Sequence, residues 1–393
     1  MSKVVVAGVG MIAFRKPGES LPYHEMGAQA ARDALRDAGL SYSDVQQAFA
    51  GYVYGDSTSG QRALYEVGMS GIPVINVNNN CSTGSTALFL ARQAVESGLV
   101  DCAIAVGFEQ MQPGALAMHW QDRPNAFQRF DELCDQQAGG TGLPLALRYF
   151  GGAGCEHMQK YGTRLETFAK VRAKASRHAA RNPLALLRKE VTVEDVMASP
   201  ELWPGVLTRL MACPPTCGAA AAVLVSEEFA KRKQLDGRVQ ILAQSMVTDT
   251  DDTFSTRSMI DLVGFRLSAG AASKVYDQSG LGPEDIDVCE LHDCFAQNEL
   301  ISYEALGFCR IGEGERFVEE ERNTYGGDVV VNPSGGLLSK GHPLGATGLA
   351  QCYELTRQLR GTAGETQVQN ARTALQHNLG LGGAAVVTMY GRA

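Results

Sequence analysis

Three segments of this 393-residue chain hold residue types that could do covalent chemistry. Cys81 stands between a strand-like run, residues 72–77, and an apolar segment typical of a helix. A thiol at the first turn of a helix faces unpaired N–H groups and the positive end of the helix dipole, so this position predicts a stabilised thiolate. The other segments are His-Asp-Cys-Phe at residues 292–295 and Gly-His-Pro at residues 341–343. A cysteine nucleophile with a distant histidine and a second cysteine predicts acyl transfer through a thioester.

The composition restricts the partners and the compartment. The formal net charge is −8, which disfavours nucleic acid and anionic membranes as partners. No apolar run reaches the ~18 residues that span a bilayer. The N-terminus enters a strand without a signal peptide, and the C-terminus is not a Ser-Lys-Leu address, so we expect a cytoplasmic protein.

The ten cysteines are expected to be free thiols of a reducing compartment. Their spacings do not match zinc ligation, so we expect no metal site. Eight of them are predicted to be small buried hydrophobic residues: Cys102, Cys134, Cys155, Cys213, Cys217, Cys289, Cys309 and Cys352. Cys81 and Cys294 remain as the thiols with expected chemistry.

The elements that position these residues follow an alternating α/β order that occurs twice. Strands and helices of the first copy are predicted at residues 4–10, 22–39, 45–53, 72–77, 81–97 and 102–107. A helix end, a Gly-Leu turn and an acidic lead into a strand recur at residues 33–45 and 276–286. We infer two similar halves, whose paired helices place Cys81 and His342 near a shared centre.

A long insertion separates the two halves. The N-terminal half is predicted at residues 1–117, completed by a strand at about 213–232, and the C-terminal half at residues 233–393, with the insertion at residues 118–212. From residue 160 to residue 190 the insertion has nine basic and two acidic residues. Such a run is usually a solvated helix face. Its concentration in one insertion favours a docking surface for a polyanionic small molecule.

Together these segments resemble the thiolases, and most of all the thiolase part of sterol carrier protein x. The matching segments, in order, are residues 51–58, 78–81, 290–295, 332–336, 339–348 and 377–380. The resemblance covers essentially the whole chain, and the separate sterol-carrier domain has no counterpart in it. It implies the thiolase fold, a layered α-β-α-β-α core with an inserted loop domain that docks coenzyme A. It also implies a homodimer or tetramer, with coenzyme A as a substrate and no resident cofactor.

Members of this family cleave 3-oxoacyl-CoA with coenzyme A, giving acetyl-CoA or propanoyl-CoA and a shortened acyl-CoA. The resemblance implies that Cys81 attacks the 3-oxo carbon and keeps the acyl group as a thioester, while His342 accepts its proton. Cys294 then protonates the departing enolate and later deprotonates the incoming coenzyme A thiol. This places the protein in the β-oxidation of fatty acids or sterol side chains.

The chain departs from the classical thiolases in two segments. Those enzymes place a second cysteine in a C-terminal Cys-x-Gly, where this chain has Gly380, and carry Asn-Glu-Ala-Phe where it has residues 292–295. The resemblance therefore implies that the acid/base thiol has moved to Cys294. It also implies that His292 and His342 hold the thioester oxygen, and that the N–H groups of Cys81 and Gly380 form the other oxyanion hole.

Several alternatives remain open from the sequence. Taken alone, Cys294 is more often structural, His342 could be a turn residue, His292 could close a strand, and His377 is expected to play a supporting role. The family also contains aldolases without the nucleophilic cysteine, against which Cys81 argues. A non-catalytic acyl-CoA or lipid-binding protein is a third class. The reaction direction and the acyl-chain preference are not decided by the residues.

Overall fold

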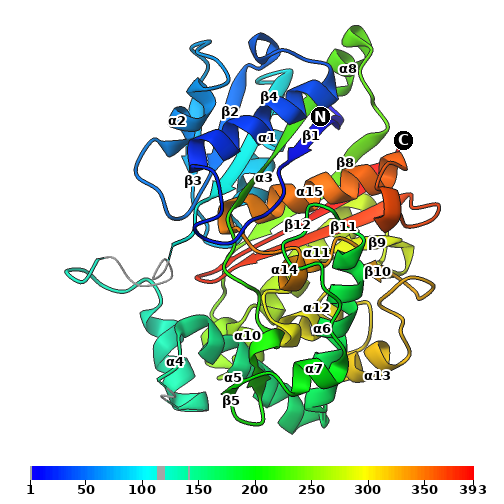
Figure 1. Cartoon of the computed structure of the whole chain (residues 1–393). Helices are drawn as coiled ribbons and strands as arrows, with labels where there is room; N and C mark the ends of the chain where they lie inside the picture. The colour runs from blue at the N-terminus through cyan, green and yellow to red at the C-terminus, as the bar shows by residue number, and fades with distance from the viewer. Residues whose placement is uncertain (1, 113–119, 140–141) are drawn as a thin grey trace.

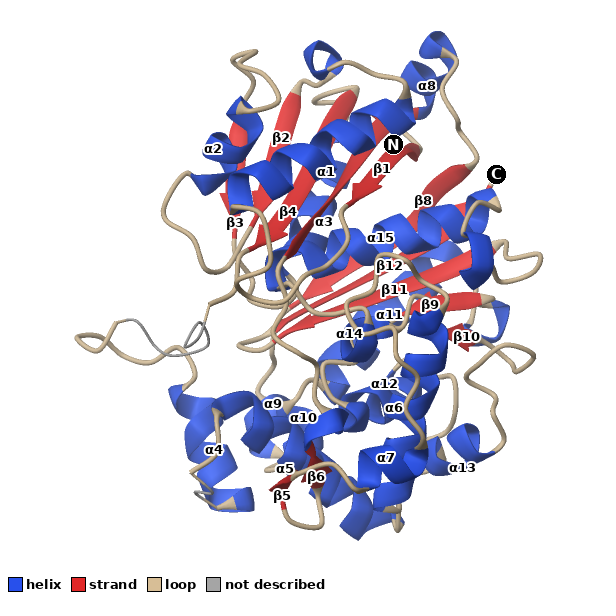
Figure 2. Ribbon diagram, viewed as in Figure 1, coloured by secondary structure: helices blue, strands red, loops and turns tan. Residues whose placement is uncertain are grey.

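The computed structural model describes residues 2–112, 120–139 and 142–393. The fold is built on one mixed β-sheet with helices packed around it (Figures 1 and 2). Ten strands form this sheet in the order β10-β9-β11-β12-β8-β1-β7-β4-β2-β3. Their bounds are β1 Val4–Met11, β2 Gln47–Gly51, β3 Val74–Val77, β4 Cys102–Glu109, β7 Gly218–Ser226, β8 Val239–Val247, β9 Val288–Glu290, β10 Val330–Val331, β11 Thr373–Gly380 and β12 Ala384–Arg392. The four predicted strands of the first copy correspond to β1, β2, β3 and β4.

The two halves of the sheet share one topology, which confirms the predicted similarity. β1, β7, β4, β2 and β3 of the first half correspond in order to β8, β12, β11, β9 and β10 of the second. In each half the first two pairings in this order are antiparallel and the last two are parallel. The halves meet where β1 pairs with β8 through Val4 and Val5.

Helices complete the predicted layering. The main ones are α1 Tyr23–Ala38, α2 Ser59–Tyr65, α3 Thr83–Glu96, α8 Glu227–Lys233, α9 Asp252–Ser255, α10 Met259–Leu262, α11 Phe265–Ser279, α12 Ala296–Ala305, α13 Gly314–Glu319, α14 Gly336–Ser339 and α15 Leu344–Arg360. α1 packs on β1 and β7, α11 packs on β8 and β12, and α3 and α15 pack against each other in the centre (Figure 1). The two halves of the sheet form the two β layers, with α3 and α15 packed on strands of both, so the resulting order is α-β-α-β-α.

The repeated helix end has a physical cause in both halves. α1 stops at Gly39 and α11 stops at Gly280, with φ angles of 68° and 71°. This left-handed conformation favours glycine because a Cβ atom would clash there. In each copy an aspartate then accepts a backbone N–H: Asp44 from Ser41 at 3.0 Å and Asp285 from Gly282 at 2.8 Å.

Apolar side chains fill the space between the layers. The central space holds Leu88 of α3 and Leu349 of α15, both fully buried, and alanines of α1 such as Ala30 and Ala34 pack closely on the first half. A larger cluster joins the second half to the inserted segment. Within the described ranges, no helix is both long enough and apolar enough to cross a membrane.

The insertion forms a mostly helical lobe below the sheet in Figure 1. It contains α4 Gln128–Ala138, α5 Leu145–Tyr161, α6 Leu165–Ala180, α7 Val193–Met197 and the strand pair β5 Glu201–Trp203 and β6 Leu207–Thr208. The predicted boundary between residues 117 and 118 falls in the segment 113–119, which lies outside the described residues.

The basic stretch of the insertion is less available than its charge suggests. Arg172 and Lys174 of α6 are only 2% and 3% exposed, and they donate to Ser339 and Glu299. Arg164 and Lys170 form ion pairs with Glu315 and Glu319 of α13. Five cations of the stretch remain for a docking surface: Lys160, Arg177, Arg181, Arg188 and Lys189. Docking of coenzyme A on this lobe stays a prediction.

Candidate active site

The loop that carries Cys81 lies between β3 and α3. Asn80 has a positive φ of 51°, and the helix begins two residues after Cys81, at Thr83. Cys81 is partly exposed. The loop approaches the end of β11 so closely that a Cβ atom on Gly380 would lie 2.2 Å from the Asn79 carbonyl oxygen. Gly380 is therefore required by this backbone contact.

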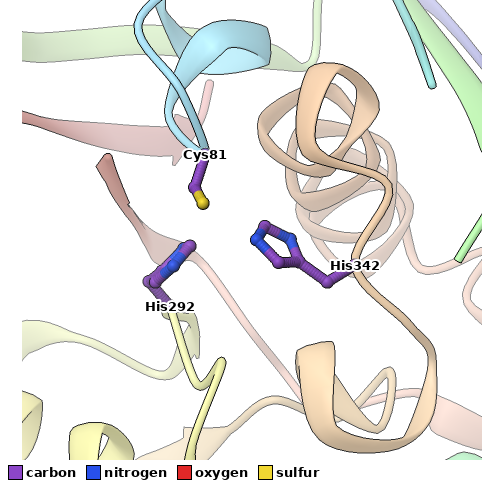
Figure 3. A group of neighbouring side chains, drawn as sticks. All are labelled: Cys81, His292 and His342. Atoms are coloured by element: carbon purple, nitrogen blue, oxygen red, sulfur yellow. The ribbon is translucent and has the colours of Figure 1, made fainter. Parts of the chain in front are cut away.

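Three predicted side chains converge from distant parts of the chain (Figure 3). Cys81 comes from the loop before α3, His292 from the loop between β9 and α12, and His342 from the turn before α15. One ligating atom of each lies within 4.8 Å of the others. The two imidazole rings have centroids 5.0 Å apart and are nearly perpendicular, at 84°. The two halves thus build one site at the N-terminal ends of the central helices.

Hydrogen bonds fix the neutral tautomer of His342. Its Nδ1 lies 2.7 Å from the Thr347 hydroxyl, which itself donates to the Pro343 carbonyl at 3.0 Å. Because the single hydroxyl proton is used, Nδ1 must be the protonated nitrogen and donate to Thr347. Nε2 keeps its lone pair, is buried, and has no hydrogen-bond partner among the described residues. His342 therefore presents a free base to the site.

Residues of β11 support His292 from behind. The Asn378 side chain lies 3.0 Å from His292 Nδ1 and donates to the Cys81 carbonyl oxygen at 3.2 Å. The backbone N–H of His292 points at His377 Nδ1 over 3.5 Å, and His377 Nε2 lies 2.8 Å from the Ser268 hydroxyl. His377 thus supports the loop of His292, in line with the supporting role expected for it.

Burial keeps both imidazoles neutral in the free protein. It lowers the pKa of His342 to about 3 and the pKa of His292 well below its ordinary value. The reason is that a buried ring cannot solvate a positive charge.

The thiolate predicted for Cys81 is wrong for the free protein. Burial and the nearby Glu109 carboxylate raise the pKa of Cys81 to about 12, although the N–H groups of Cys81 and Leu381 act in the opposite direction. Cys81 precedes the first turn of α3, and burial disfavours the anion because the thiolate loses its hydration. The free site therefore holds a neutral thiol beside a neutral base.

Cys294 lies near Cys81, and a third thiol accompanies it. Cys294 is 5% exposed, and its pKa is raised well above the ordinary value by burial and by the charges of Cys213 and Cys81. The N–H of Cys213 donates to the Cys294 carbonyl at 2.9 Å. Of the eight cysteines predicted to be buried, Cys155, Cys213 and Cys309 are partly exposed, so that prediction is wrong for these three, and the other five are buried.

Sequence reasoning missed two buried polar residues of this site. Asn378 is fully buried and contacts both His292 and Cys81. Glu109 is 1% exposed, accepts N–H groups of Val53 and Gly345 at 3.1 and 3.0 Å, and has a pKa raised to about 7 by burial. A signal existed for Glu109, because it is a charged residue at the end of the apolar strand β4. Asn378 lies within residues 377–380, a segment that matches the family, but no role was predicted for it.

The chain is similar to known proteins over nearly its whole length. Residues 4–196 match the family model "Thiolase, N-terminal domain", and residues 249–392 match "Thiolase C-terminal domain-like". Sterol carrier protein 2 of Bos taurus is 54% identical over 392 residues, covering 99% of this chain and 72% of that protein. Non-specific lipid-transfer protein-like 2 of Caenorhabditis elegans is 45% identical over 397 residues, covering 99% and 96%.

Among solved structures, the Ltp2-ChsH2(DUF35) aldolase is similar with a TM-score of 0.84 and 23% identity, covering 99% of this chain and 98% of that one. This similarity establishes the fold and leaves the reaction open. The two family models and the sequence relatives carry the assignment: the chain belongs to the thiolase family.

Proposed function

We propose that the protein is a 3-oxoacyl-CoA thiolase that works through an acyl-enzyme on Cys81. The observation that carries the proposal is the convergence of the Cys81 sulfur with a buried imidazole nitrogen of His342 that has a lone pair and no partner among the described residues. A neutral thiol next to a neutral base suits proton transfer during attack. The substrate class comes from the family, and acetyl-transferring synthesis is the same reaction in reverse.

We assign one group to each step. The Cys81 sulfur attacks the 3-oxo carbon while its proton passes to His342 Nε2, and the carbon–carbon bond then breaks to leave an acyl thioester and the enolate of acetyl-CoA. Cys294 gives its proton to the enolate carbon. The Cys294 thiolate next takes the proton of the coenzyme A thiol, which attacks the acyl-Cys81 carbon. The displaced Cys81 sulfur recovers its proton from His342.

The developing negative charges need preorganised donors, which often supply the largest single catalytic effect. We assign His292 to the thioester oxygen of the substrate. We assign the oxyanion of the attacked carbonyl to the N–H groups of Cys81 and Gly380, as the resemblance implies. The N–H of Leu381, one residue beyond Gly380, also acts on the Cys81 sulfur and is a further candidate donor.

The partners are part of the proposal. Coenzyme A would dock on the inserted lobe, where five cations of residues 160–190 remain outside the buried or ion-paired set. A homodimer is the expected minimum assembly, as in the family.

Incubation with acetyl-CoA followed by mass spectrometry tests the acyl-enzyme. We expect one acetyl group on Cys81 and none in Cys81→Ala. A protein that binds acyl-CoA without this adduct, or that cleaves a side-chain acyl-CoA adduct without coenzyme A, would instead be a carrier or an aldolase.

The two neighbouring thiols provide a matched pair for the acid/base assignment. Cys294→Ala should still accept acetyl from acetyl-CoA but lose carbon–carbon cleavage by about 100-fold or more, since a positioned general acid contributes about 10²–10⁴. Cys213→Ala removes a thiol from the same group and should retain cleavage. Full cleavage activity in Cys294→Ala with loss in Cys213→Ala would exchange the two roles.

A further inference from the structure

The orientation of the Asn378 amide decides which nitrogen of His292 carries a proton. One of the two polar atoms of this amide lies 3.2 Å from the Cys81 carbonyl oxygen and 3.0 Å from His292 Nδ1. A backbone carbonyl can only accept a hydrogen bond, so this atom must be the NH₂ group. Its second proton then points to His292 Nδ1.

The other side of the amide leads to the same orientation. The Gln376 side chain lies 2.7 Å from the Gly348 carbonyl, so its nitrogen faces that carbonyl and also donates to the Ser85 hydroxyl at 2.8 Å. Ser85 therefore uses its own proton to donate to Asn378 Oδ1 at 2.8 Å. The backbone carbonyls of Cys81 and Gly348 can only accept, and they thus fix the direction of each hydrogen bond from Gln376 through Ser85 to Asn378. All three side chains are fully buried.

Since Asn378 donates to Nδ1, this nitrogen of His292 holds a lone pair. The ring is buried and neutral, so its one proton sits on Nε2. We propose that Asn378 is a positioning residue that holds His292 as an N–H donor toward the thioester oxygen of the substrate. This inference rests on the proposed function and deepens it.

The two imidazoles of the site then have opposite roles. His342 offers the lone pair of Nε2 as a base, because Thr347 occupies its Nδ1 proton. His292 offers a proton, because Asn378 occupies its Nδ1 lone pair. Thr347 and Asn378 each form a hydrogen bond with Nδ1 of a histidine, but in opposite directions: Thr347 accepts from His342 and Asn378 donates to His292.

The same arrangement opposes capture of a metal ion. Cys81, His292 and His342 have one ligating atom each within 4.8 Å of the others, a donor set that suits zinc-like cations. A metal needs a lone pair on each imidazole. On His292, Nε2 carries a proton and has no lone pair for a metal, and the lone pair on Nδ1 accepts a hydrogen bond from Asn378.

Nuclear magnetic resonance of the ring nitrogens tests the tautomer directly. In protein labelled with ¹⁵N at histidine, we expect Nδ1 of His292 to resonate as the unprotonated nitrogen and Nε2 as the protonated one. His342 should show the reverse pattern. The His292 signals are assigned by their loss in His292→Asn. A protonated Nδ1 on His292 in the wild-type protein overturns the proposal.

The variant Asn378→Asp should reverse the tautomer, because a carboxylate oxygen accepts a proton from Nδ1. We expect kcat to fall by about 10²–10³ with little change in KM, as when one oxyanion donor is removed. Affinity for Co²⁺, added alone as a spectroscopic probe, should rise by about 10–100-fold, since a carboxylate behind a ligating histidine strengthens metal binding. Asn323→Asp, at a buried asparagine 3% exposed beside Tyr303, is the control and should leave the His292 signals and Co²⁺ affinity unchanged.

These outcomes separate the inference from the function on which it rests. An acetyl adduct on Cys81 together with a protonated Nδ1 on His292 removes the role of Asn378 and leaves the thiolase. The proposed tautomer without any adduct removes the thiolase activity and leaves the hydrogen-bond chain. If Asn378→Asp does not fold, the wild-type ring signals still decide. Unchanged Co²⁺ affinity in a folded Asn378→Asp protein contradicts the proposal.

Discussion

Cys81, the proposed nucleophile, lies in surroundings that favour the neutral thiol. Burial and Glu109 raise its pKa to about 12, so little thiolate exists near neutral pH. We predict that alkylation of Cys81 by iodoacetamide accelerates continuously between about pH 6 and pH 9, because the thiolate fraction of an acid with so high a pKa still rises about tenfold per pH unit. Mass spectrometry of the Cys81 peptide measures the rate. A plateau below pH 7 would show a thiolate–imidazolium pair instead.

At the scale of single residues, the sequence predicted the reactive groups better than their supports. Cys81 follows three asparagines, His342 stands between glycine and proline, and His292 lies two residues before a second cysteine; the three side chains do converge. Asn378 follows Gln376 and His377 in β11, in a segment that resembles the family, but nothing in the sequence shows what it contacts. Its importance depends on the Cys81 carbonyl, which is nearly 300 residues away in the chain and comes near only after folding.

The central helices α3 and α15 approach each other through glycine, which sets the separation of Cys81 and His342. A Cβ atom on Gly348 would lie 2.2 Å from the Ser85 backbone nitrogen. We predict that Gly348→Ala lowers the free energy of unfolding by about 1–3 kcal/mol and reduces cleavage activity, because the helices must move apart. Urea unfolding and the rate of acetylation measure both effects.

Gly270 of α11 provides the matched control for that substitution. It is also a helical glycine, but it is exposed and a Cβ atom there would meet no atom within 4 Å. Gly270→Ala should stabilise the protein by about 0.5–1 kcal/mol, which is the helix propensity difference alone. Equal effects of the two substitutions would contradict the packing argument.

Helix α6 of the inserted lobe is held to the second half by a buried ion pair. Lys174 is 3% exposed, and it donates to Glu299 of α12 and, at 3.3 Å, to the Val331 carbonyl. We predict that Lys174→Met costs about 3–5 kcal/mol of unfolding free energy, because Glu299 keeps a buried charge without its cation. Adding Glu299→Gln should recover much of the loss. A double-mutant cycle in urea measures the coupling, and additive losses would contradict this account.

At the scale of the molecule, the repeat is what the sequence predicts best. The helix end at Gly39 and its copy at Gly280 are local patterns, so they can be read before the fold is known. The close junction of α3 with α15, and the burial of Arg172 and Lys174, depend on contacts between distant segments. The basic run of the insertion therefore suggested a charged surface, but two of its cations, Arg172 and Lys174, are buried in the fold.

Buried neutral histidines make the stability of the whole protein sensitive to acid. His178 of α6 is 2% exposed, and burial lowers its pKa from 6.5 to about 3. The unfolded chain therefore binds a proton that the folded protein does not between these two values. The stability that His178 contributes is fully present above pH 6.5 and is lost progressively as the pH falls toward 3. Between pH 7.5 and pH 5.5 the loss should be about 1.4 kcal/mol for this one group.

The variant His178→Asn isolates this contribution. Asparagine can keep the donor to the Asn332 carbonyl, which His178 Nδ1 approaches at 3.0 Å, but it cannot titrate in this range. Urea unfolding at pH 7.5 and pH 5.5 should show a pH-dependent loss that is about 1.4 kcal/mol smaller than in the wild type. His24→Asn, at a partly exposed position in α1, should keep the wild-type difference. If His178→Asn loses as much stability as the wild type, then His178 accepts its proton inside the folded protein and is not held neutral by burial.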